Sequence, residues 1–281
     1  MPKNQTPLLR GVQSVAVIDR VTHIVRSVAN DFVMPSFHAL RPEDILAKHT
    51  PEDPDDIVTL ADQATERRLV EALDGLVPGA VFVGEEAVCE DPSLVEVLST
   101  GEPAWVIDPI DGTKNFARGS PEFGVMVALV EGGATRASWI ALPALTTMVV
   151  AEAGRGALLN GAAPPHHAVP GRPRGTVHDR LMPPPISSKV REALRDRFDA
   201  LPSSGAAAVE YASILRGEKD FVIYYRLLPW DQLPGALAVV EAGGAAVHLD
   251  GRSYTARSID QVTILAASPE LAELVRGWIN G

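Results

Sequence analysis

Two aspartates, Asp108 and Asp111, stand three positions apart and are the residues of this chain best suited to bind a cation. Gly112 and Thr113 follow directly, and the backbone N–H groups of this pair are free to donate to an anion. Carboxylate oxygens are ligands that Mg²⁺ prefers. The segment therefore predicts a site that holds a metal ion beside a phosphate group, although Asp-Pro and Asp-Gly are also ordinary turn dipeptides.

Further acids stand where secondary structure is expected to begin or end. Asp62 lies in the first turn of a predicted helix, where a carboxylate also suits the helix dipole. Glu85 and Glu86 follow an apolar run that ends in glycine. Asp231 opens another helix within a Trp-Asp dipeptide, and it could serve only as the N-terminal cap of that helix. A shared site requires the fold to bring these separate acids together.

Residues 56–62, 84–86, 105–116 and 230–231 together resemble the motifs of the inositol monophosphatase family, in the same order and at similar spacing. The resemblance runs from about Val12 to the C-terminus. That family contains magnesium-dependent, lithium-sensitive phosphatases, and it shares its core with fructose-1,6-bisphosphatase and the 3′-phosphoadenosine-phosphate phosphatases. The resemblance implies an α/β fold built as a layered αβαβα sandwich, and an enzyme that hydrolyses phosphoric monoesters.

The resemblance also implies which residues hold the metal ions. Glu85, Asp108 and the carbonyl of Ile110 correspond to the ligands of a first ion. Asp108, Asp111 and Asp231 correspond to the ligands of a second ion, and a weaker third ion is expected near Glu85. The implied cofactor is Mg²⁺, with two or three ions bound, Mn²⁺ as a substitute and Li⁺ as an inhibitor. Oxygen ligands of this kind suit Mg²⁺, which prefers octahedral coordination and retains several waters.

The catalytic group implied by the resemblance consists of Asp62, Thr113 and Glu85. Thr113 matches the threonine that pairs with a helix carboxylate, here Asp62, to orient and deprotonate the attacking water. Gly112 has no Cβ, so its backbone can approach the substrate phosphate closely, and Thr113 adds a second N–H donor. Glu86 is expected to orient a metal ligand or a water, and the alternative is an exposed acid that touches nothing.

The expected substrate contacts depart from the family pattern. Many inositol phosphatases have an acid seven positions before the aspartate of the Trp-Asp motif, and here that position is Tyr224. Arg226 could meet a second anionic group. The expected substrate is a small phosphorylated polyol resembling inositol 1-phosphate, and the alternatives are histidinol phosphate, a sugar bisphosphate or a 3′-phosphonucleotide. A non-catalytic regulatory or binding module of the same fold is the alternative of a different class.

The composition favours a globular protein that acts on a small molecule. The chain has 281 residues, 46% of them hydrophobic, with a net charge of −11 and no basic block. These properties argue against nucleic acid and anionic membranes as partners. The single Cys89 excludes an intramolecular disulfide, and no signal peptide or transmembrane run is evident. We therefore expect a cytoplasmic enzyme, a small phosphorylated metabolite as its partner, and a homodimer.

The elements that position these residues follow from the apolar pattern. Apolar residues recur at three- and four-residue steps over residues 12–32 and predict a long amphipathic helix. Residues 45–56, which include Lys48 and two prolines, predict an exposed loop. Residues 104–107 predict a buried strand that Pro109 stops, so that both aspartates leave the sheet edge together.

The later elements change character at a segment rich in Pro, Gly and His, residues 162–175, which is the best internal boundary. Before it, residues 123–152 alternate apolar runs with turn signals and predict an antiparallel meander. After it, helices and strands alternate. We therefore divide the chain into an N-terminal α+β part, residues 1–161, with most metal ligands, and a C-terminal α/β part, residues 162–281, that contributes Asp231 and the substrate-side wall.

Overall fold

The computed structural model describes residues 12–48, 56–165, 171–225, 228–255 and 261–281. The helices in these ranges are α1 (Val12–Val28), α2 (Leu60–Leu73), α3 (Glu85–Glu90), α4 (Thr113–Ala117), α5 (Pro184–Leu194), α6 (Ala207–Leu215), α7 (Pro229–Glu241) and α8 (Pro269–Asn280). The strands are β1 (Ile45–Ala47), β2 (Ile57–Thr59), β3 (Val81–Gly84), β4 (Ala104–Asp111), β5 (Gly124–Glu131), β6 (Ala134–Leu142), β7 (Thr147–Glu152), β8 (Gly156–Leu159), β9 (Arg174–His178), β10 (Asp199–Ala200), β11 (Phe221–Tyr225), β12 (Ala245–His248) and β13 (Val262–Ala266).

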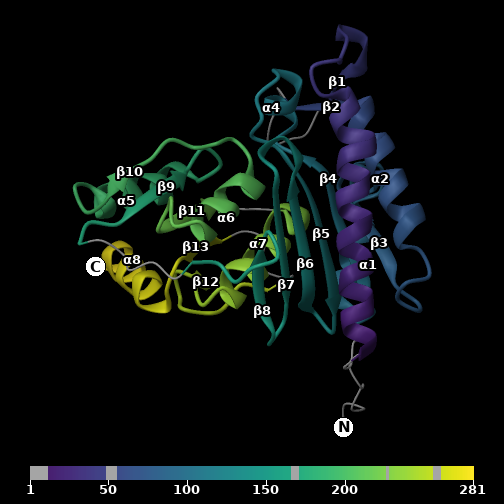
Figure 1. Ribbon diagram of the computed structural model, residues 1–281. Helices are drawn as coiled ribbons and strands as arrows, with labels where there is room; N and C mark the ends of the chain where they lie inside the picture. Colours follow the sequence, from purple (N-terminus) through teal and green to yellow (C-terminus); the bar gives the residue numbers. More distant parts are fainter. Residues whose placement is uncertain (1–11, 49–55, 166–170, 226–227, 256–260) are drawn as a thin grey trace.

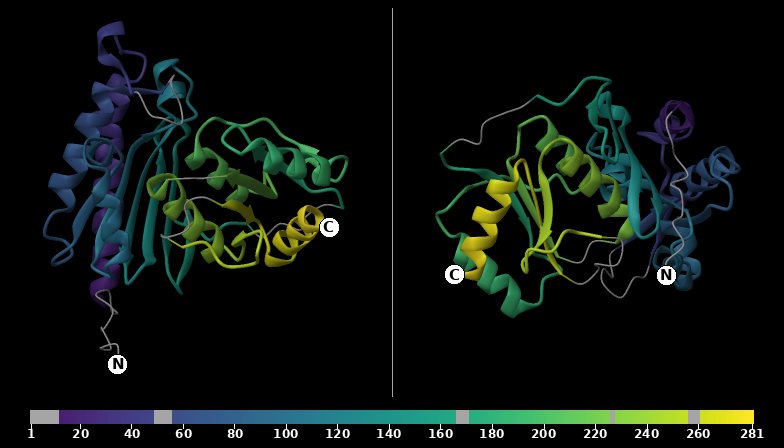
Figure 2. Two further views of the ribbon diagram at one scale, coloured as in Figure 1. Left: turned by 180° about the vertical axis from the view of Figure 1, so that it is seen from behind. Right: turned by 90° about the horizontal axis from the view of Figure 1, so that it is seen from below.

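Helices and sheets alternate in five layers (Figure 1). Helices α1 and α2 cover one face of a six-stranded sheet, and α6 and α7 fill the space between that sheet and a five-stranded sheet. Helices α5 and α8 cover the outer face of the five-stranded sheet. Figure 2 shows the same layers from behind and from below. The predicted α/β fold with αβαβα layers is confirmed.

The six-stranded sheet has the order β3-β4-β5-β6-β7-β8, and its strands are antiparallel from β4 onward. This arrangement confirms the predicted meander. Every residue of β4 and β5 is buried, because helices cover both faces of the sheet. Trp105 and Ile107 pack toward α1 and α2, whereas Val106 packs toward Trp230 and Leu233 of α7. Strand β4 and the first turns of α7 are therefore held together by the same apolar core.

The five-stranded sheet has the order β10-β9-β11-β13-β12. Strands β9, β10 and β11 are parallel, so their carboxyl ends meet at one edge, and the chain passes from β11 toward α7. In the sequence, the boundary expected at residues 162–175 falls between β8, the last strand of the six-stranded sheet, and β9, the first strand of the five-stranded sheet, and α6 and α7 pack against both sheets. No helix among the described residues is long and apolar enough to cross a membrane.

Three local expectations require correction. The strand of the two aspartates does not stop at Pro109, since β4 continues to Asp111 through a register shift against β5, and proline is tolerated at such a bulge. The aspartates therefore lie within an interior strand. The long helix ends at Val28 and continues as a π-helical turn, Ala29–Val33. Of the loop expected at residues 45–56, the first three residues form β1, which pairs with β2, and residues 49–55 lie outside the described residues.

Candidate active site

Three aspartates converge where β4 ends and α7 begins, and we refer to Asp108, Asp111 and Asp231 as the aspartate triad. Asp108 and Asp111 are almost completely buried, with 1% and 8% of their surface exposed. Asp231 lies in the first turn of α7. One carboxylate oxygen from each residue lies within 4.8 Å of the others. The fold thus brings Asp231 together with Asp108 and Asp111, which are distant from it in the sequence, and all three are predicted metal ligands.

The carboxyl groups of the aspartate triad repel one another. Burial raises the pKa of Asp108 and of Asp231 well above the usual range, and neighbouring acids raise both further. The carboxyl groups of Asp108 and Asp231 interact directly, and each affects the pKa of the other. Oδ1 of Asp108 is buried and has no hydrogen-bond partner among the residues that the structure describes. A buried acceptor without a donor, beside two further acids, fits a hard divalent cation.

Backbone N–H groups of α6 hold Asp111. The amides of Ala207 and Ala208 donate to Oδ1 and Oδ2 of Asp111 over 3.1 and 2.7 Å. Burial raises the pKa of Asp111 to about 7, and these two hydrogen bonds oppose the shift. The sequence carries no signal for this contact, because a run of alanines specifies a helix but not what its first amides bind.

Glu85 and Glu86, the glutamate pair, form a second acidic group that Lys48 neutralises. Nζ of Lys48 lies 2.7 Å from Oε1 of Glu85 and 2.9 Å from Oε1 of Glu86. Burial lowers the pKa of Lys48, but the two carboxylates outweigh it, and the pKa is raised. The Lys48 side chain is only 7% exposed, so its expected place in an exposed loop is wrong. The pairing of β1 with β2 directs the Lys48 side chain inward. The alternative that Glu86 is an exposed acid without contacts is wrong, because Glu86 accepts a hydrogen bond from Lys48.

Glu66 fixes the start of α3, where the glutamate pair stands. Its Oε2 and Oε1 accept from the backbone N–H groups of Glu86 and Ala87, both over 2.9 Å. Gly84 leaves room for the Glu66 carboxyl group, because a Cβ there would lie 2.3 Å from the carboxyl carbon of Glu66. Burial raises the pKa of Glu66 to about 7. Spacing could have indicated this residue, since it stands four positions after Asp62 on the same face of α2.

Thr113 and Asp62 are in hydrogen-bond contact. The Thr113 hydroxyl lies 3.1 Å from Oδ1 of Asp62 and 3.0 Å from the carbonyl oxygen of Ile110. Oδ2 of Asp62 accepts from the backbone N–H of Thr59 over 2.9 Å, and the two residues cap α2 reciprocally. Burial raises the pKa of Asp62 to about 7. A carboxyl group with that pKa can accept a proton near neutral pH.

Gly112 forms the tight turn between β4 and α4. Its φ of 80° lies in the left-handed region that favours glycine. A Cβ at this position would lie 2.8 Å from Cβ of Ala206 and 3.1 Å from the carbonyl oxygen of Glu122. A side chain here would therefore separate this turn from the start of α6. The turn places Thr113 directly after the aspartates of β4.

Tyr224, on β11, stacks on His178 of the neighbouring strand β9, with ring centroids 4.4 Å apart. It is 5% exposed, and its hydroxyl is buried without a hydrogen-bond partner among the described residues. Burial raises the pKa of Tyr224, and the charges of Asp111 and Asp231 add to the shift. The phenol is therefore within electrostatic range of the aspartate triad. Arg226, the other expected substrate contact, lies outside the described residues.

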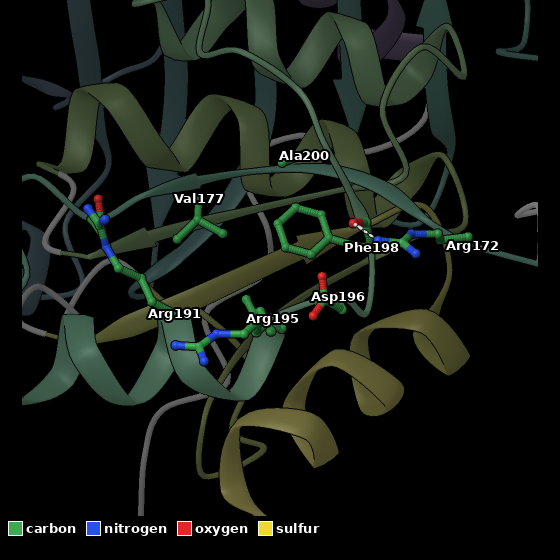
Figure 3. A pocket seen from close by; sticks show the side chains of 9 residues that line it. Arg172, Val177, Arg191, Arg195, Asp196, Phe198 and Ala200 are labelled. Carbon is green, nitrogen blue, oxygen red and sulfur yellow. Dashed lines mark hydrogen bonds and ion pairs between the residues drawn. The ribbon is translucent and has the colours of Figure 1, made fainter.

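The hollow drawn in Figure 3, about 480 Å³ in volume, is a different place. It lies beside α5 and the edge of the five-stranded sheet, and it contains none of the predicted site residues. Two of its arginines are already paired, Arg172 with Asp199 at 2.8 Å and Arg191 with Asp179. Because these cations are neutralised and the aspartate triad is elsewhere, this hollow is not the candidate active site.

Comparison with known proteins shows which protein family the chain belongs to. The model of the inositol monophosphatase family matches residues 17–277. The chain belongs to this family. The fructose-1,6-bisphosphatase/inositol-1-monophosphatase of Thermotoga maritima is 31% identical over 205 residues, which cover 72% of this chain and 75% of the relative. The putative Nus factor SuhB of Neisseria meningitidis serogroup B is 29% identical over 232 residues, 79% of this chain and 84% of the relative.

Solved structures of inositol monophosphatase relatives have a similar fold. The IMPase of Thermotoga maritima gives a TM-score of 0.76 at 26% identity, covering 94% of this chain and 96% of that one. The extragenic suppressor protein suhB of Bartonella henselae gives a TM-score of 0.74 at 23% identity, covering 94% and 98%. The predicted family, the layered fold and the class of phosphoric monoester hydrolase are therefore confirmed, while the roles of individual site residues stay predictions.

Proposed function

We propose that the chain is a Mg²⁺-dependent phosphomonoesterase that hydrolyses a small phosphorylated polyol resembling inositol 1-phosphate. The aspartate triad carries the proposal, because the unpartnered Oδ1 of Asp108 lies among carboxyl groups that repel one another. Oxygen ligands of this kind are those that Mg²⁺ prefers. Membership of the inositol monophosphatase family supplies the class of reaction.

The proposed cation ligands divide into two sets that share Asp108. Glu85, Asp108 and the Ile110 carbonyl would hold one ion, with a weaker third ion near Glu85. Asp108, Asp111 and Asp231 would hold the other. When bound, the cations would lower the pKa of a water and neutralise charge on the phosphoryl group. Mn²⁺ is the expected substitute, and Li⁺ the expected inhibitor.

Thr113 and Asp62 are proposed to act on the attacking water rather than on the metal. The Thr113 hydroxyl, 3.1 Å from Asp62, can orient a water and pass a proton to that carboxylate. The pKa of Asp62, raised to about 7 by burial, supports this role. The N–H groups of Gly112 and Thr113 would bind the phosphate, since no Cβ hinders its approach at Gly112.

Selectivity among polyol phosphates is expected to be weaker than in an enzyme with an acid at the position of Tyr224. A buried carboxylate accepts hydrogen bonds from hydroxyls and is left unpaired by a wrong substrate, whereas a phenol can either donate or accept. The buried, unpartnered hydroxyl of Tyr224 supports a contact with the substrate. Arg226 would favour substrates with a second negative group.

The selectivity is tested by kcat/KM for inositol 1-phosphate, glycerol 2-phosphate, histidinol phosphate and fructose 1,6-bisphosphate. We expect modest differences in the native protein, and a stronger preference for inositol 1-phosphate in Tyr224→Glu. A strong native preference for inositol 1-phosphate that Tyr224→Glu leaves unchanged would exclude Tyr224 as the selectivity position.

Metal dependence is the decisive test of the proposed class. Protein that has been made metal-free should lose phosphatase activity and regain it with Mg²⁺. Full activity after verified metal removal would contradict the proposal. A non-catalytic module is the alternative of a different class, supported by the relative that is named a putative Nus factor. It predicts no phosphate release from any phosphomonoester of a broad panel in the presence of Mg²⁺.

A homodimer and a cytoplasmic location also stay predictions. Light scattering coupled to size exclusion would give the mass in solution, and fractionation of cells that express the protein would give its location. The net charge of −11 supports a small phosphorylated metabolite, rather than nucleic acid or an anionic membrane, as the partner.

A further inference from the structure

Glu210 is a buried carboxylate that the proposed reaction does not use. It lies on α6, has 0% exposed surface and forms an ion pair with Lys219. The Lys219 ammonium also donates to the carbonyl oxygen of Pro202 over 3.0 Å. Removing two charges from water is costly, and a buried ion pair seldom adds net stability. A local role near the candidate site would explain its presence.

The contacts of Glu210 show what the ion pair holds in place. Oε1 of Glu210 accepts from the backbone N–H of Ser204 over 2.7 Å and lies 2.8 Å from the Ser204 hydroxyl. On its other side, the carbonyl oxygen of Ser204 accepts from Nδ2 of Asn115 over 2.7 Å. Asn115 belongs to α4, the helix that begins with Thr113. Ser204 is therefore fixed from both halves of the chain.

The segment fixed at Ser204 leads within four residues to the two amides that hold Asp111. We propose that Glu210 is a positioning residue. Its carboxylate, paired with Lys219, fixes Ser204 so that the first amides of α6 hold Asp111 in the orientation in which it would bind a cation. The cation-binding part rests on the proposed function, whereas the positioning of the α6 amides does not.

The chemistry of the two carboxylates suits this division of roles. Charge-assisted hydrogen bonds are about twice as strong as neutral ones, so a paired Glu210 holds Ser204 firmly. Each Asp111 oxygen accepts one N–H group and keeps a further lone pair, which leaves both oxygens able to bind a cation. Glu210 and Ser204 thus support Asp111 without occupying the lone pairs with which Asp111 would bind a cation.

Two double variants and a matched control test the proposal. E210A/K219M removes the acceptor without leaving Lys219 unpaired, and E210Q/K219M keeps an acceptor oxygen of similar shape. D220N is the control, because Asp220 is also fully buried and ion-paired. Its partner is Arg174, and its carboxylate accepts from the Arg174 backbone N–H rather than from Ser204. All variants retain the residues proposed to bind metal or substrate.

The first measurement is amide hydrogen exchange at Ala207 and Ala208 in metal-free protein. We expect exchange at least about tenfold faster in E210A/K219M, and within about threefold of the native rate in E210Q/K219M and D220N. The second is Mn²⁺ affinity by calorimetry, expected to be about tenfold weaker in E210A/K219M alone, as for other residues that support metal ligands.

Unchanged exchange in E210A/K219M, or an equal acceleration in D220N, would overturn the positioning role. If E210A/K219M does not fold, S204A replaces it, because it removes one of the two Ser204 donors. Faster exchange in S204A supports the role, and native exchange overturns it. Failure of the native protein to bind Mn²⁺ would overturn the proposed function, while the exchange measurement would still decide the role of Glu210.

Discussion

The glutamate pair and the aspartate triad are neighbouring acidic groups that the protein neutralises in different ways. Nζ of Lys48 lies 2.7 Å from Oε1 of Glu85 and 2.9 Å from Oε1 of Glu86, so a side-chain cation neutralises the glutamate pair. Among the described residues, no lysine or arginine forms an ion pair with the aspartate triad. Its members instead have two backbone amides, which donate to Asp111, and one oxygen of Asp108 that has no hydrogen-bond partner among those residues.

This difference indicates where an added cation matters most. The glutamate pair is already compensated, so a cation that binds Glu85 must compete with the ammonium of Lys48. Among the described residues the aspartate triad has no paired ammonium or guanidinium group, so a divalent cation can bind there without displacing a side-chain cation. We expect most of the cation-binding free energy to come from the triad.

Asp108→Asn is expected to have the largest effect, because Asp108 would bridge both ions. The value of kcat should fall by at least about 100-fold, as for other central electrostatic groups. The Tm of the metal-free protein should rise, since one of three repelling acids is removed. Activity assays and thermal unfolding with and without Mg²⁺ measure both effects, and the exposed Glu273→Gln is the control. Native activity in Asp108→Asn would refute the assignment of the triad.

Thr113→Ala and Asp62→Asn should affect catalysis without affecting the acids of either group. We expect kcat to fall by roughly 100-fold, because the proton acceptor or its relay is lost. Cation affinity, measured by calorimetry, should stay near the native value, since neither side chain is a proposed ligand. A kcat within a factor of about three of native in Thr113→Ala would show that the assigned role is wrong.

The pH dependence of stability should reveal the uncompensated acids. Burial raises the pKa of Asp62, Glu66 and Asp111 to about 7. Between about pH 5 and 7 the folded protein therefore binds more protons than the unfolded chain, so the free energy of unfolding falls as pH rises. We expect the metal-free Tm to fall by roughly 5–10 °C from about pH 5 to 8. Mg²⁺ should reverse part of the loss at the higher pH. A metal-free Tm that rises across this range would contradict the expected linkage.

Lys48→Met should have the smallest effect and tests the compensated group. Glu85 and Glu86 are 20% and 14% exposed, so the loss of stability should be about 1–3 kcal/mol, below that of a fully buried pair. Mg²⁺ should reduce the loss, because a cation at Glu85 can replace the ammonium. Arg276→Met removes an exposed ion pair and is the control, with a smaller expected loss of stability than Lys48→Met. A loss that Mg²⁺ leaves unchanged would argue against a cation at Glu85.

The sequence predicted those parts of the site that stand at the ends of regular elements. Asp62 and Asp231 could be placed because apolar periodicity marks the beginnings of α2 and α7, and Asp108 because it directly follows the apolar run of residues 104–107. The layered architecture follows from the same pattern, since strands buried on both faces require helices on both faces. The motif order then predicted that these ends meet.

The remaining parts of the site depend on contacts that no local pattern encodes. Lys48 stands among prolines and acids, which predicted an exposed loop, and only the pairing of β1 with β2 turns it inward. Pro109 predicted the end of a strand. The strand continues because a bulge accommodates this proline, and that bulge depends on pairing with β5, which the local sequence does not show. Glu210 is one acid in a helix until the fold places it beside Ser204 and Lys219.

The aspartate triad also sets the order in which the site can form. Asp231 follows Asp108 by roughly 120 residues, so bringing them together closes a long loop at considerable entropic cost. A nascent chain that has not yet released α7 from the ribosome carries only two of the three carboxylates, and β12 and β13 of the five-stranded sheet emerge later still. A cation bound by all three carboxylates would therefore bind late in folding, once α7 has packed in place. It would stabilise the folded state and would not act as a folding nucleus.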